Sequence, residues 1–237
     1  MAGDDGHDHV NDAALVAKVS QVLLSQACQR IDFHWGKLHV TGKAYRAVVL
    51  ALIDSRIDIF EADGADHTLD PDVGASYIGN PESIIIRPHL NAHTALNRRA
   101  LVHEATHAVQ DDQLNGEWVW RLVDEATAYI AEWLFVIHAS RDPDHLISNP
   151  DPNDSIEVIA VEIARGLADK PGASPDPAAM RRLGDAIFHD PTYSVTMALH
   201  PWIRDDGVTK PDVPLGTVLD ASAFTRLKAW RSHLVGE

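Results

Sequence analysis

Cysteine and positive charge are both scarce in this sequence. Cysteine occurs once, so the 237 residues can form no intramolecular disulfide and no zinc site built from several thiolates. Lys and Arg total 20 against 35 Asp and Glu, which gives a net charge of -15. That charge repels phosphate groups and anionic lipids. We therefore expect a protein that binds neither nucleic acid nor a membrane surface.

Long apolar runs are also missing. The most apolar stretch, residues 129–139, is interrupted by Glu132 and is too short to span a bilayer. The N-terminal residues MAGDDGHDHVNDAA are acidic and lack the basic start and apolar core of a secretory signal. These features predict a cytoplasmic protein without a membrane span.

Histidine, in contrast, is abundant in a chain of otherwise ordinary globular composition. Hydrophobic residues make up 45% and charged residues 23%, so a chain of this length can bury a core without disulfides. The 14 histidines supply side chains that act as bases near neutral pH and as metal ligands. Their spacing decides which of them could act together.

Apolar spacing predicts mixed α and β structure in the first part of the chain. A helix is expected from a cap at Asn11 or Asp12 to Gln29, and a helix at 44–53 lies between strands at 33–40 and 56–60. A loop at 63–74 precedes two strands, 75–78 and 83–87, which are joined by a turn. Two long helices follow, from Asn91 or Thr94 to Gln113 and over 117–138, with a turn at 115–116.

Only helical patterns occur in the last part of the chain. A proline-containing linker or long loop at 141–154 precedes helices at 155–168, 177–189, 194–200 and 221–233. We predict an α+β fold, with a mixed subdomain over residues 1–145 and a helical subdomain over residues 146–237.

The strongest local motif is HExxH, at residues 103–107 inside an apolar-periodic helix. Four residues advance a helix about 40° past a full turn and about 6 Å along its axis, so both imidazoles leave one face and can bind one metal ion. Glu104 is rotated by about 100°, which takes it out of the ligand set but within reach of a metal-bound water. Zinc is the expected metal, because it favours imidazole ligands and keeps an open position in catalytic sites.

A third ligand is expected on the next helix. If the two long helices pack antiparallel about a turn centred near residue 115, the midpoint of the two histidines, residue 105, lies opposite residue 125. Residue 125 is Glu. Asp124 is level with the site but rotated by about 100°, and Glu132 lies about 10 Å further along the axis. The geometry favours Glu125, with Asp124 as the second choice.

HEATH followed by DEATAYIAEW resembles the gluzincin clan, the thermolysin-like HExxH…E zinc metallopeptidases. The resemblance covers about residues 74–138 and implies that residues 1–145 form a zincin-like catalytic core, a small mixed sheet plus the site helices. It implies His103, His107 and Glu125 as zinc ligands and Glu104 as the general base of peptide-bond hydrolysis. It also implies that the strand SIIIR, residues 83–87, is an edge strand that holds an extended peptide substrate.

Two features of the clan are not matched directly. Tyr129 stands where thermolysin-like enzymes carry an Asp that orients one histidine, so this support is expected from Asp111 or Asp124. The clan also steadies the oxyanion with a downstream His or Tyr, for which the sequence offers Tyr193, His189 and His200 without favouring one.

Three other interpretations of the motif, outside peptide hydrolysis, have to be weighed. Two His and a Glu could lie on a solvated helix face by chance. The chain could be a non-catalytic zincin-like module that binds metal in a regulatory role. Glu104 and His107 also form the ExxH pair of di-iron carboxylate bundles, but that class requires a second ExxH, and the sequence has none.

Overall fold

The chain has an α+β fold, as its sequence predicts. The computed structural model describes residues 11–62, 74–79, 82–87, 95–114, 119–140, 155–191, 193 and 202–203. The helices are α1 (Ala13–Leu23), α2 (Gln26–Gln29), α3 (Gly42–Ile53), α4 (Ala95–Leu114), α5 (Arg121–Ala139), α7 (Ser155–Leu167) and α8 (Pro177–His189). The strands are β1 (Asp32–Trp35), β2 (Leu38–Thr41), β3 (Asp58–Glu61), β4 (Ala75–Gly79), β5 (Glu82–Ile86), β6 (Val119–Trp120) and β7 (Trp202–Ile203).

The predicted first helix is divided into α1 and α2. Asp12 caps α1 by accepting hydrogen bonds from the backbone N–H groups of Ala14 and Leu15. Ser25 is extended, and its hydroxyl accepts from the backbone N–H of Cys28 to start α2. The prediction of one helix was wrong because this serine side chain caps a new helix instead of continuing the old one.

The predicted strand at 33–40 is a hairpin of two strands. β1 and β2 pair antiparallel, with Trp35 opposite Leu38. Gly36 follows Trp35 with a φ of 58°, a left-handed conformation that glycine adopts without a steric cost. Gln113, near the end of α4, exchanges two hydrogen bonds of 2.8 Å with the backbone of His39 on β2. This contact fixes the C-terminal end of α4 against the hairpin.

A three-stranded sheet lies beside α4. Its strand order is β3-β5-β4, with β3 parallel and β4 antiparallel to β5. The expectation that SIIIR is an edge strand was wrong, because β5 is the central strand and pairs on both sides. Its run of three buried isoleucines, 84–86, is typical of a strand covered on both faces. The edge strand next to α4 is β4.

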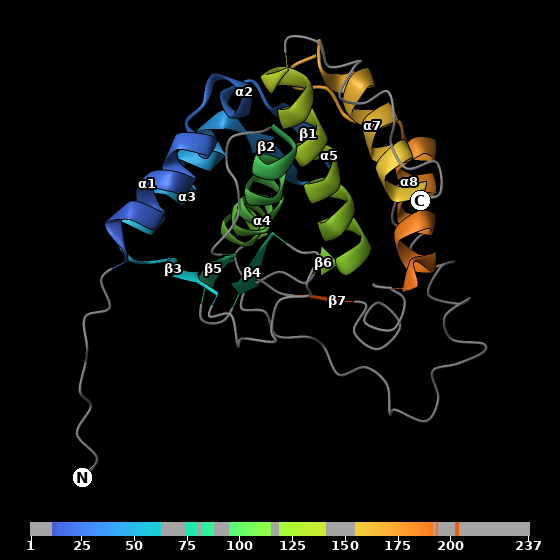
Figure 1. Ribbon diagram of the computed structural model, residues 1–237. Coiled ribbons are helices and arrows are strands. Elements are labelled where there is room, and N and C mark those ends of the chain that lie inside the picture. Colours follow the sequence, from blue (N-terminus) through green and yellow to red (C-terminus); the bar gives the residue numbers. More distant parts are fainter. Residues whose placement is uncertain are drawn as a thin grey trace, which may run out of the picture.

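The two long helices form the centre of the molecule. Figure 1 shows α4 and α5 side by side, with α1 and α3 on one flank and α7 and α8 on the other. α5 begins at Arg121, later than predicted, because Val119 and Trp120 form β6 and pair with β7. None of the described helices is both long and apolar enough to cross a bilayer.

One apolar core joins all the described helices. It contains side chains from every described helix from α1 to α8 and from strands β1 to β5. Several predictions lie outside the described residues: the boundary at residue 145, positions 63–73 of the loop predicted at 63–74, the turn at 115–116 and the helices at 194–200 and 221–233. The division into two subdomains therefore stays a prediction.

Candidate metal centre

Helix α4 presents the HExxH residues at the edge of the core. Its opposite side is buried and consists largely of small and aliphatic side chains: Leu101, Val102, Ala105, Ala108 and Val109. Thr106 donates a 2.7 Å hydrogen bond to the Val102 carbonyl, and its hydroxyl lies 2.7 Å from that of the buried Tyr45. This packing fixes the rotation of α4 and turns His103 and His107 toward α5.

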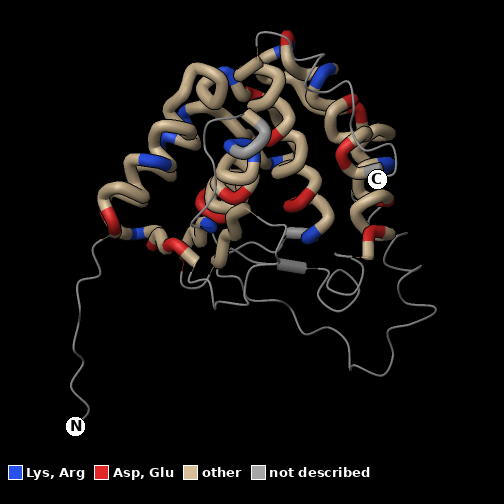
Figure 2. The backbone as a smooth tube through the Cα atoms, viewed as in Figure 1, with Lys and Arg blue, Asp and Glu red and all other residues tan. Residues whose placement is uncertain are grey.

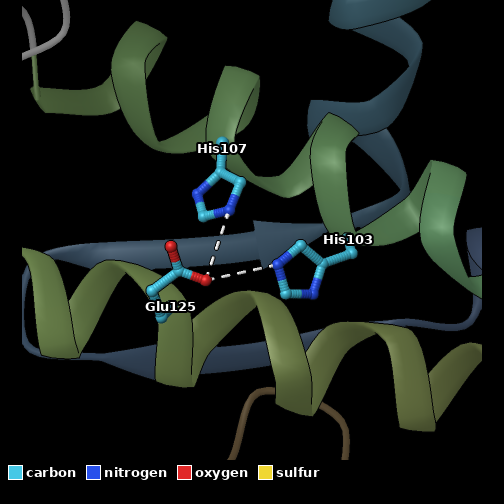
Figure 3. Close-up of side chains that lie close together, drawn as sticks. All are labelled: His103, His107 and Glu125. Carbon is cyan, nitrogen blue, oxygen red and sulfur yellow. Dashed lines mark ion pairs between the residues drawn. The ribbon is translucent and has the colours of Figure 1, made fainter. Parts of the chain in front are cut away.

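Helix α5 brings Glu125 to the two histidines. The buried Gln110 of α4 donates a 3.0 Å hydrogen bond to the carbonyl of Asp124 and ties the two helices together. Glu125 Oε2 lies 3.4 Å from His103 Nε2 and 3.9 Å from His107 Nε2. Figure 3 shows the three side chains pointing toward one another, with both contacts meeting at one oxygen of Glu125. The structure thus brings together the three residues that the sequence singled out as metal ligands.

Two of the three donor separations are close to those around a small tetrahedral metal ion. One ligand atom from each of the three residues lies within 4.8 Å of the others. Ligand bonds of about 2.0–2.2 Å at tetrahedral angles place neighbouring donors about 3.3–3.5 Å apart. The 3.4 Å separation meets this value, and the 3.9 Å separation exceeds it by a few tenths of an ångström. Two imidazoles and one carboxylate are also a donor set found in catalytic zinc sites.

Each histidine has a separate carboxylate at its other ring nitrogen. His107 Nδ1 lies 3.0 Å from Asp124 Oδ2, and His103 Nδ1 lies 3.2 Å from Glu132 Oε2. Metal-binding histidines are generally oriented in this way, because the second nitrogen fixes the ring and raises its basicity as a ligand. Both rings therefore direct Nε2 toward Glu125.

One of these two carboxylates is predictable from the sequence pattern. Asp124 is one of the two residues expected to orient a histidine, whereas Glu132 was expected only to lie too far from the ion to bind it. Because α4 and α5 pack antiparallel, His103 lies further from the turn than His107 and faces the part of α5 that carries Glu132. The spacing of Glu132 from Glu125 on one helix face was the signal that could have identified it.

The second expected residue, Asp111, lies beside Tyr77 of β4. Burial raises the pKa of the Tyr77 hydroxyl, and the neighbouring Asp111 carboxylate raises it further. At His107 the carboxylate that contacts Nδ1 is that of Asp124. Asp111 therefore belongs to the contact between α4 and the edge strand.

Glu104 lies against the edge strand. The backbone N–H of Tyr77 donates a 2.7 Å hydrogen bond to Glu104 Oε2. Burial raises the pKa of Glu104, and although His103 and His107 lower it, the result stays above the ordinary value for a glutamate. A carboxylate with a raised pKa beside two imidazoles is suited to accepting and returning a proton.

The site concentrates negative charge around the two imidazoles. Figure 2 shows acidic residues on both helices of the central pair. Burial would lower the pKa of His107, but Asp124 and then Glu125 raise it to about 9. Burial likewise opposes charge on His103, but Glu125 and Glu132 raise its pKa. These carboxylates favour a cation at the histidines, whether it is a proton or a metal ion.

One of the three oxyanion candidates lies beside the site. Tyr193 and Tyr129 approach each other with their hydroxyl oxygens 2.8 Å apart, and the Tyr129 ring packs edge-on against His103 at 4.9 Å between centroids. Burial and then the charge of Glu125 raise the pKa of Tyr193, which keeps its hydroxyl protonated and able to donate. His189 is exposed, and His200 lies outside the described residues.

The site is therefore defined by its own geometry. It consists of two imidazoles and a carboxylate from two packed helices, a second glutamate beside an edge strand, and a tyrosine pair. Comparisons of the chain with protein-family models, with curated proteins and with solved structures found no match.

Proposed function

We propose that this protein is a zinc-dependent peptidase of the gluzincin type. The observation that carries the proposal is the convergence of His103 Nε2, His107 Nε2 and Glu125 Oε2, with separations of 3.4 and 3.9 Å from the carboxylate oxygen. Zinc is the proposed metal because catalytic zinc sites use two imidazoles and one carboxylate, and because the HExxH pattern places a glutamate base next to such a zinc. Bound there, it would supply Lewis acidity and lower the pKa of water toward about 7.

Glu104 is the proposed general base. Its carboxylate accepts a proton from the attacking water and returns that proton to the leaving amine of the cleaved peptide bond. The raised pKa of Glu104 supports this role, because a base whose pKa lies nearer neutrality can both take and release a proton. Tyr193 is the proposed donor of a hydrogen bond to the oxygen that gains charge in the transition state, and its place beside Tyr129, which packs against His103, supports this role.

The proposed substrate is a peptide bound in an extended conformation along β4. Among the described strands β4 pairs with β5 alone, and the N–H of Tyr77 is directed at Glu104 instead of at β5. The side of β4 that pairs with no described strand thus faces the candidate base. An extended peptide could add to that side through backbone hydrogen bonds, with its scissile bond next to the site.

The alternative is a metal-binding module of the same fold that regulates without cleaving peptides. The favouring observation is the Tyr77 hydrogen bond to Glu104 Oε2, which occupies one oxygen of the base. Peptide-library cleavage measured at pH 7 with and without a chelator separates the two functions. Cleavage that disappears with the chelator supports the peptidase, and bound zinc without any cleavage supports the module.

The experiment that tests the proposed mechanism is the substitution Glu104→Gln. It removes the base but leaves all three ligands, so we expect bound zinc to be retained while peptide cleavage falls by about 10²–10⁴-fold. Glu162→Gln is the matched control, because Glu162 is an exposed residue of α7 that pairs with Arg182. Cleavage by Glu104→Gln at the rate of this control would contradict the mechanism.

A further inference from the structure

Arg99 connects the candidate metal centre to helix α7. It lies on α4, four residues before His103. Its Nη1 atom is 2.7 Å from Glu157 Oε1 on α7 and 3.9 Å from Glu132 Oε1 on α5. The other oxygen of Glu132 is 3.2 Å from His103 Nδ1. A continuous series of polar contacts therefore runs from α7 through Arg99 and Glu132 to a proposed zinc ligand.

Burial makes these contacts more consequential than a surface ion pair. The Glu132 side chain is 7% exposed, so its carboxylate depends on Arg99 and His103 for compensation of its charge. The Arg99 guanidinium is itself held in place, because it lies 4.5 Å from the centroid of the buried Trp133 ring. Burial opposes the charge of Arg99, but Glu132 and then Glu157 raise its pKa above the ordinary value.

We infer that Arg99 and Glu157 are positioning residues for the metal centre. Glu157 fixes the Arg99 guanidinium, Arg99 fixes the Glu132 carboxylate, and Glu132 holds His103 with Nε2 turned toward Glu125. The inference rests on the proposed zinc site and adds a role for α7, which supplies the outermost group of the series. Neither Arg99 nor Glu157 belongs to the group of proposed metal ligands.

The chain contains a matched ion pair that ends away from the site. Arg182 of α8 lies 2.8 Å from Glu162 of α7, a separation close to that of Arg99 and Glu157. The side chains of Arg182 and Glu162 are 53% and 59% exposed, and exposed ion pairs of this kind contribute little to the stability of a protein. Arg182→Gln thus breaks an arginine–glutamate contact of α7 without disturbing Glu132 or His103.

The test is the zinc affinity of the full chain, measured by competition with a chromophoric chelator. Mutation of a residue that orients a metal-binding histidine typically lowers the metal affinity by about 10–100-fold. Arg99 acts one contact further from the metal than such a residue. We expect Arg99→Gln to weaken zinc binding by about 10-fold, Glu157→Gln by about 3-fold and Arg182→Gln not at all. The double variant of Arg99 and Glu157 should match Arg99→Gln, because Glu157 acts through Arg99.

Two further measurements distinguish positioning from general stability. Arg99→Lys keeps the charge, so it should recover part of the lost affinity. In the metal-free protein, the ring nitrogen signals of His103 in NMR spectra should shift in Arg99→Gln and stay unchanged in Arg182→Gln. If Arg99→Gln fails to fold, as shown by circular dichroism, the milder Glu157→Gln carries the test.

The results separate this inference from the proposed function. If the unaltered protein binds zinc and Arg99→Gln and Glu157→Gln bind it with the same affinity as the unaltered protein, the positioning role is overturned and the zinc site stands. A loss of zinc affinity in Arg182→Gln as large as that in Arg99→Gln would also overturn the positioning role. Absence of zinc binding by the unaltered protein would overturn the proposed function and this inference together.

Discussion

At the scale of single residues, the site is specified by what lies on both sides of each imidazole. Nε2 of each histidine faces Glu125, and Nδ1 faces Asp124 in His107 and Glu132 in His103. A chance pair of histidines on a solvated helix face would have no reason to be buried between three carboxylates. His103 is buried and the His107 side chain is 12% exposed, which favours a metal centre over a surface coincidence.

Asp124→Asn tests the carboxylate beside His107. An amide has the shape of the carboxylate but not its charge, so His107 becomes a weaker ligand, and we expect zinc affinity to fall by about 10–100-fold. Asp112→Asn, an exposed position on α4, is the control. Chelator competition measures both variants, and unchanged affinity in Asp124→Asn would show that this contact does not support the metal.

At the scale of elements, the sequence predicted the long helices better than the short segments. Apart from the start of α5, the two long helices follow from apolar spacing sustained over many residues. The position of Glu125 opposite the two histidines follows from their antiparallel packing. The break before α2 and the turn of the first hairpin depend on single residues, Ser25 and Gly36, whose local conformations outweigh the regional pattern. The central place of β5 depends on which strands pair with it, a long-range choice that local spacing does not encode.

Helix α5 also carries a histidine that titrates abnormally at its C-terminal end. Burial, and then the charge of Arg30, lower the pKa of His138 from 6.5 to about 4. Between these two values the unfolded chain binds a proton that the folded protein does not, so the free energy of unfolding falls as the pH falls from 6.5 to 4.

His138→Gln should remove this part of the pH dependence. Urea unfolding of the metal-free protein, compared at pH 5 and pH 7, measures it. We expect the loss of stability at pH 5 to be smaller in His138→Gln than in the unaltered protein. An equal loss in both would mean that His138 is protonated in the folded protein.

At the scale of the whole molecule, the charge and the core set the context of the site. The net charge of -15 gives the protein a field that attracts cationic ligands and repels anionic ones. The core shared by all described helices lets α7 and α8 pack against α5, the helix that carries Glu125. The helices that follow the site helices in the sequence thus support them from one flank.

The charge predicts a preference among peptide substrates. Peptides that differ only in flanking Lys or Glu should differ in kcat/KM by about 10-fold in favour of Lys at low salt, and the difference should shrink as ionic strength rises. Cleavage rates at two salt concentrations measure the effect. A preference for Glu, or one that is insensitive to salt, would show that local contacts in the cleft decide specificity instead.

The central claim is that His103, His107 and Glu125 together bind one catalytic zinc ion. The most direct measurement is the zinc content and affinity of the purified chain, unaltered and with Glu125→Ala or Glu104→Gln. We predict one zinc per chain, at least about 10-fold weaker binding in Glu125→Ala and unchanged binding in Glu104→Gln. No bound zinc, two bound irons, or zinc binding that is indifferent to Glu125→Ala would contradict the claim.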